Sequence, residues 1–135
     1  MSPARRTFTL RALAPLALMT LIFWSSAQSG GGAIPEWAHV LAHFCEFAAL
    51  AALWLWALLP GMGRTAFAAA ALVTFAYAVS DEIHQSFVPG RLSDPVDVVV
   101  DSAGIATALL VGAYARGRAF TRRAQSQRAG RRPRA

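Results

Sequence analysis

The residues of this sequence best suited to chemistry are its acids and histidines, which gather in three short stretches. All seven acids and all three histidines lie within residues 36–46, 81–84 and 94–101. Carboxylates and imidazoles can transfer protons, pair with cations or hold a divalent metal ion. We predict a polar functional site, with no catalytic residue assigned, made of His43, Glu46, Asp81, Glu82, His84, Gln85, Arg91, Asp97 and Asp101. Asp97 and Asp101 are the candidates for holding a divalent cation, and we expect no cofactor.

The elements that position these residues are apolar helices. Apolar residues make up 56% of the 135 residues, too many for a soluble domain of this length. Four runs have the ~17–25 residues that a helix needs to cross a membrane: Leu10–Ala27, Trp37–Leu59, Thr65–Phe87 and Pro95–Tyr114. The sequence therefore predicts an all-α membrane protein, a bundle of four transmembrane helices. The first run ends in Ser-Ser-Ala, so a cleaved signal peptide is its alternative interpretation.

Helical spacing places the polar residues of each segment on one face. His43 and Glu46 share a face of the second helix, and Asp101 lies on an acidic stripe of the fourth. Small residues continue this stripe and would let helices approach closely in lipid: Gly104, Ala108 and Gly112. At ~1.5 Å per residue, His43, Asp81 and Asp101 reach a similar depth, with Glu46 below them. We therefore expect the three to meet.

Some of the polar residues also have structural explanations. Asp94 precedes Pro95 as a helix N-cap does, and Asp97 lies where an acid complements the helix dipole. Glu36 fits a first-turn acid, and His39 fits a side chain at the membrane interface. For the deeper groups, a structural buried network is the alternative to a functional site.

Arginine sets the predicted orientation. All thirteen basic residues are Arg; eight follow Tyr114, and only Arg91 is expected outside. The positive-inside rule then places both termini in the cytoplasm, with residues 28–36 and 86–94 outside. We divide the chain into a cytoplasmic segment 1–9, a transmembrane domain 10–116 and an Arg-rich, disordered cytoplasmic tail 117–135. The tail is expected to face the anionic cytoplasmic leaflet, and charge placed in this way argues against nucleic acid as a partner.

Three segments resemble the conserved blocks of VanZ-like proteins, the group associated with teicoplanin resistance. His43–Leu50 is similar to their His-Phe-x-Glu-Tyr-x-x-Leu block, and Ser80–Arg91 to their Asp-Glu-x-His-Gln…Pro-Gly-Arg segment. Asp97–Gly104 resembles the Asp-x-x-x-Asp-x-x-Gly that follows. Four positions depart from the family pattern: His39 and Val40 stand where relatives have a basic pair, Phe47 stands where they have a tyrosine, and Val96 where they have a basic residue. The ligands of those cations in relatives are expected to bind less tightly here.

The resemblance implies a multi-pass protein of the bacterial inner membrane and cell envelope, without a defined reaction. Our first hypothesis is that the site binds a membrane lipid, a lipid-linked envelope precursor or a lipoglycopeptide from the outer leaflet. Arg91 would grip an anionic headgroup or pair with Asp81 or Glu82. One alternative is an intramembrane hydrolase or transferase acting on a lipid headgroup, with Glu82, His84 or His43 as general base. The other is a small proton-coupled transporter.

Overall fold

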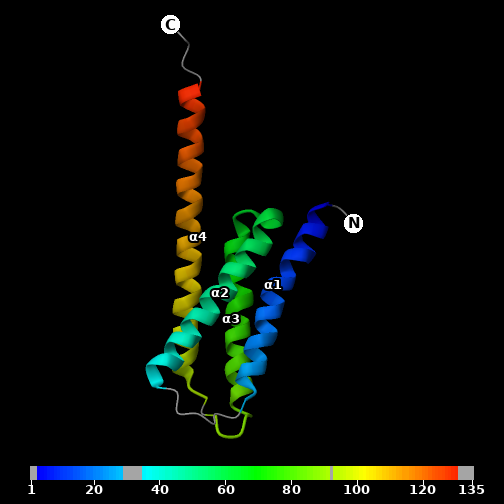
Figure 1. The fold of residues 1–135 in the computed structure, drawn as a ribbon, viewed down its shortest axis with the longest axis vertical. Helices are drawn as coiled ribbons and strands as arrows, with labels where there is room; N and C mark the ends of the chain where they lie inside the picture. The colour runs from blue at the N-terminus through cyan, green and yellow to red at the C-terminus, as the bar shows by residue number, and fades with distance from the viewer. Residues whose placement is uncertain (1–2, 29–34, 92, 131–135) are drawn as a thin grey trace.

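The computed structural model describes residues 3–28, 35–91 and 93–130, and four helices make up most of this part (Figure 1). They are α1 (Pro3–Ser26), α2 (Glu36–Met62), α3 (Thr65–Gln85) and α4 (Pro95–Gly130). Each contains a span long and apolar enough to cross a membrane, which confirms the predicted all-α four-helix membrane protein. Much of the first expected outer loop, residues 29–34, lies outside the described residues.

The four helices run up and down, so the starts of α1 and α3 lie at the same end of the bundle as the finish of α2 (Figure 1). We call the opposite end, where α1 and α3 finish and α2 and α4 begin, the site end. The long C-terminal part of α4 projects away from the site end, past the other helices. Both ends of the described chain therefore lie away from the site end, as an even number of spans requires. Which end faces the cytoplasm is still a prediction.

The core lies where α2 meets the other three helices. Phe47, Leu50 and Ala51 of α2 are fully buried, and they pack with one buried residue from each neighbour: Ile22, Ala78 and Ile105. Helix α4 lies close against the backbone of α2 at Gly104, where an added Cβ would overlap the carbonyl oxygen of Phe44. The close approach explains why a small residue stands at this position.

The far end of α2 extends one turn beyond the predicted boundary at Leu59. Pro60 lies inside the helix, and the turn is made by Gly63, whose φ is +57°. Because proline has no N–H, the carbonyl of Trp56 loses its usual helical partner. Arg11 of α1 donates to this carbonyl at 3.2 Å and lies over the Trp56 ring, which joins α1 to α2.

The prediction of a disordered tail from Gly117 onward is wrong for most of its length. Helix α4 continues without a break to Gly130, and residues 131–135 lie outside the described residues. The tail is rich in Arg, Ala and Gln, all good helix formers, and its first proline is Pro133. Extending an existing helix also avoids the unfavourable step of nucleating a new one. A polar, charged composition was therefore not sufficient evidence for disorder.

Candidate functional site

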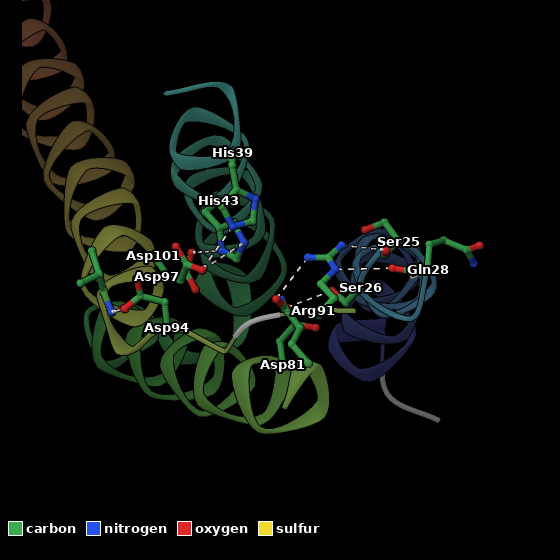
Figure 2. A network of polar contacts seen from close by, with 12 residues as sticks. Ser25, Ser26, Gln28, His39, His43, Asp81, Arg91, Asp94, Asp97 and Asp101 are labelled. Atoms are coloured by element: carbon green, nitrogen blue, oxygen red, sulfur yellow. Dashed lines mark hydrogen bonds and ion pairs between the residues drawn. The ribbon is translucent and has the colours of Figure 1, made fainter. Parts of the chain in front are cut away.

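Two histidines and two acids meet between α2 and α4 at the site end. His43 Nδ1 donates to Asp101 Oδ1 at 3.1 Å, and both side chains are almost completely buried. His39 Nε2 lies 3.3 Å from Asp97 Oδ2, and His43 Nε2 lies 4.0 Å from the same oxygen. His39 and His43 are four residues apart, as are Asp97 and Asp101, so each pair lies on one face of its helix. We call these four residues the His–Asp cluster (Figure 2).

A second group of polar contacts joins α1 to α3 and the loop that follows it. Asp81 Oδ2 accepts hydrogen bonds from Ser26 Oγ at 3.0 Å and from Gln85 Nε2 at 2.8 Å. Gln85 Oε1 in turn accepts from Arg91 at 3.2 Å. Figure 2 shows Arg91 reaching toward the end of α1, where it donates to the carbonyl oxygens of Ser25 and Gln28.

The expected direct pairing of Arg91 with Asp81 or Glu82 is wrong. The guanidinium binds two backbone carbonyls and the Gln85 side chain. The reason is the end of α1, where the last carbonyls of a helix lack helical partners and accept readily from a cation. Arg91 thus reaches Asp81 only through Gln85, and three of its five N–H donors are already engaged within the protein.

Glu46 lies between the two groups. Its half-buried carboxylate has electrostatic neighbours on both sides: His43 and Asp101 toward α4, and Asp81 and Arg91 toward α3. Within the described parts of the chain, no hydrogen bond or ion pair reaches it. The expected meeting of three residues near Glu46 is therefore confirmed for His43 and Asp101, which are in direct contact. Asp81 is only an electrostatic neighbour of Glu46.

Several polar atoms at the end of α3 are buried without a partner among the described residues. They are Asp81 Oδ1, Glu82 Oε1 and His84 Nε2. Asp81 and Glu82 are more than nine-tenths buried, and the His84 ring stacks on Phe23 with centroids 4.4 Å apart. A buried acceptor left unpaired costs about 1–3 kcal/mol, and more when it is charged. The two carboxylate oxygens therefore have unused capacity to accept from a hydrogen-bond donor or to pair with a cation.

An apolar groove lies beside the His–Asp cluster, lined by the same two helices. Its volume is about 480 Å³, and its walls are almost entirely apolar, with Trp37 and Phe44 from α2 facing Val100 and Ala103 from α4. A polar cluster bordered by an apolar groove is the arrangement that an amphiphilic molecule fits, with its headgroup in one and its chain along the other.

The family of this chain follows from a comparison with models of protein families. The VanZ/LLP1 family model matches residues 12–116, which is most of the chain. The chain belongs to the VanZ/LLP1 family. No curated protein and no solved structure matches it. The VanZ/LLP1 match includes every residue of the predicted site, and the last turns of α4 lie beyond it.

Within this VanZ/LLP1 fold, most predicted site residues lie at the site end. Asp94 is a cap, as expected, because its Oδ1 accepts from the backbone N–H of Val96 at 2.9 Å. Asp97 faces His39, so its position near the helix start does not make it a second cap.

Sequence reasoning undervalued His39 and missed Ser26. The sequence favours a position at the membrane interface for His39, yet its contact with Asp97 makes it part of the His–Asp cluster. Its four-residue spacing from His43 was the available signal. Ser26 binds Asp81 from α1, and no pattern in the sequence links these two residues. The sequence indicates Asp97 and Asp101 as the candidate metal ligands, but the structure brings a different set together. His39, His43 and Asp97 converge, whereas Asp101 contacts the far side of the His43 ring.

Proposed function

We propose that the protein is an envelope protein of the bacterial cytoplasmic membrane that binds an amphiphile with an amine-bearing headgroup at its site end. A lipid, a lipid-linked envelope precursor or a lipoglycopeptide could carry such a headgroup. The site end would face outward, as the distribution of arginine predicts. Glu46 carries the proposal, because this half-buried carboxylate lies near Asp81 and Asp101 and has no hydrogen bond in the described structure.

The charge of the site favours a cationic headgroup over an anionic one. The one cation expected at this end is Arg91, and three of its five N–H donors, one on each nitrogen, already bind Ser25, Gln28 and Gln85. The unpaired oxygens of Asp81 and Glu82 are acceptors when ionised. An ammonium group supplies three N–H donors and a positive charge, so it would satisfy several of these oxygens together. Charged groups within a membrane are expected to pair in this way.

The groove beside the His–Asp cluster supports an amphiphile over a small polar solute. Trp37, Leu41 and Phe44 would contact an acyl chain lying along α2, with Val100 and Ala103 on the other wall. The headgroup of that molecule would then reach His39, whose side chain is 39% exposed. The apolar area buried by such a chain favours binding by roughly 25 cal/mol per Å².

The opposite end of the bundle fits the cytoplasmic leaflet. A hollow of about 680 Å³ there is lined by Arg64 and Arg116, together with Phe67 and Phe120. Beyond it, Arg118, Arg122 and Arg123 are exposed along α4. Basic residues near the cytoplasmic surface attract anionic lipids by about 1 kcal/mol each. We propose that this end holds anionic phospholipid while the site end holds the amine.

Native mass spectrometry of the purified protein in detergent tests headgroup binding. Phosphatidylethanolamine and phosphatidylglycerol with identical acyl chains would be compared at equal concentration. We expect the amine lipid to bind more tightly to the wild type and Glu46→Gln to lose that preference, since a charged hydrogen bond contributes about 1.5–3 kcal/mol. The matched control is Glu36→Gln, an exposed acid of the same helix. Equal binding of both lipids by the wild type, or a Glu46→Gln protein with undiminished preference, would refute the proposal.

A second candidate function is an intramembrane enzyme acting on a lipid headgroup, and the His43–Asp101 contact favours it. Asp101 fixes the His43 tautomer, which leaves Nε2 free to accept a proton as a general base. The test is turnover of a lipid labelled in its headgroup by the purified protein. Release of label by the wild type and not by His43→Gln supports catalysis, and no release by either contradicts it.

A further inference from the structure

The His43 ring lies between two carboxylates, and its hydrogen bond to Asp101 uses only one of its two ring nitrogens. Asp101 is a carboxylate and can only accept, so the His43 atom that contacts it, Nδ1, carries the proton. In neutral His43 the other nitrogen, Nε2, is then an acceptor. Yet Nε2 lies 4.0 Å from Asp97 Oδ2, which is also an acceptor. Two acceptors at this distance repel each other, and a cation between them, either a proton on Nε2 or a metal ion, relieves the repulsion.

His39 points toward the same oxygen. Its Nε2 lies 3.3 Å from Asp97 Oδ2, and one possible ligand atom from each of His39, His43 and Asp97 lies within 4.8 Å of the other two. A tetrahedral zinc ion with bonds of about 2.0–2.1 Å holds its ligand atoms about 3.4 Å apart. The distances from Asp97 Oδ2 to the two Nε2 atoms, 3.3 and 4.0 Å, differ from that spacing by less than 1 Å.

The surroundings of the three atoms match those of metal ligands in proteins. A histidine that binds a metal commonly donates its other ring N–H to a carboxylate, and Asp101 plays that part for His43. His43 and Asp97 are buried, whereas His39 is 39% exposed and leaves a path from the site end. Two imidazoles and one carboxylate suit Zn²⁺ and related transition metals, while Mg²⁺ and Ca²⁺ prefer oxygen alone.

We propose that His39, His43 and Asp97 bind one divalent transition-metal ion, with Asp101 orienting His43 from behind. Three protein ligands leave a fourth position of the metal open to water or to an oxygen of a bound molecule. The site does not depend on the proposed amphiphile, because its ligands come entirely from α2 and α4. It also differs from the pair of acids, Asp97 and Asp101, that spacing alone indicates.

The test is metal binding by the full chain, purified without a polyhistidine tag in nanodiscs of phosphatidylcholine. After chelation and dialysis, zinc content would be measured by elemental mass spectrometry against empty nanodiscs. Affinity would follow from competition with a chromogenic chelator, and cobalt absorption would report the coordination geometry. We expect one zinc per chain, with Asp101→Asn weakening binding by about 10–100-fold. His39→Ala and Asp97→Asn remove ligands, so each should weaken it further.

The third histidine provides the matched control. His84 lies on α3 against Phe23, away from the His–Asp cluster, so His84→Ala should bind zinc like the wild type. His39 is partly exposed, and its replacement should leave helicity and elution volume unchanged, which separates loss of a ligand from loss of folding. Wild-type binding no tighter than that of the His39→Ala/Asp97→Asn double variant would overturn the proposal. An equal loss in His84→Ala would overturn it as well. Neither result bears on headgroup selectivity, which is measured without added metal.

Discussion

Replacing Gly104 with alanine tests whether the close contact of α2 and α4 holds the site together. A Cβ at position 104 would overlap the carbonyl oxygen of Phe44 and come within 3.2 Å of the backbone nitrogen of Ala48. Both atoms belong to the α2 backbone, so no side-chain rotation relieves the overlap. The two helices must separate, and His43 and Asp101, which lie next to this contact, must separate with them.

The expected change in stability follows from two opposing effects. Overpacking a close contact typically costs about 1–3 kcal/mol, and a clash with backbone belongs near the upper end. Alanine in place of glycine within a helix recovers about 1 kcal/mol. We therefore expect Gly104→Ala to lower the free energy of unfolding by about 2 kcal/mol.

The same helix supplies two comparison positions. At Gly117 an added Cβ meets nothing within 4 Å, so Gly117→Ala should be neutral or stabilising. At Gly112 the Cβ would overlap only the end of the Leu55 side chain, which can move, and would meet the Phe67 ring at an ordinary 3.8 Å, so Gly112→Ala should lie between the other two. The three variants would be unfolded in mixed micelles by increasing dodecyl sulfate, with helicity followed by circular dichroism. A Gly104→Ala protein that unfolds at the same point as Gly117→Ala would refute the packing argument.

Three further predictions concern the orientation and the polar site. A reporter that is active only in the periplasm should stay inactive when fused after Ala135. Reporter activity at this position would show that the predicted orientation in the membrane is wrong. Arg91→Lys cannot reproduce three divergent hydrogen bonds and should lower stability in the same unfolding assay by about 1.5–3 kcal/mol, whereas Arg64→Lys, at an exposed turn, should not. Asp101→Asn keeps an acceptor for His43 and should fold normally, but it should reduce phosphatidylethanolamine binding in native mass spectrometry, and undiminished binding would count against a role for this carboxylate.

Features that depend on helical periodicity and helix length could be predicted from the sequence. The four spans follow from apolar runs, and the meeting of His43 with Asp101 follows from depth and from the small residue at Gly104. These features need only the rise of a helix, the thickness of a membrane and the tendency of helices to approach at small residues.

The contacts that escaped prediction depend on how separate elements meet in space. Arg91 binds carbonyl oxygens at the end of α1, and every residue has such an oxygen, so residue types could not identify Ser25 and Gln28 as its partners. Ser26 likewise carries no signal in the sequence, and only the packing of α1 against α3 places it beside Asp81. The extent of α4 escaped prediction for a different reason. The charge of the segment after Tyr114 indicates disorder, but helix propensity and continuity with the preceding helix outweigh it.

The length of α4 gives this small protein a mechanical property. The helix has 36 residues and so extends about 54 Å, from Asp97 and Asp101 near its start to the arginines near its finish. Its last turns lie beyond the other three helices (Figure 1). If α4 tilted by about 5° about its close contact with α2 at Gly104, its far tip, about 39 Å away, would move by about 3 Å. A rigid α4 would therefore act as a lever, and a shift of about 1 Å at Asp97 would appear at the arginines near its finish as a displacement several times larger.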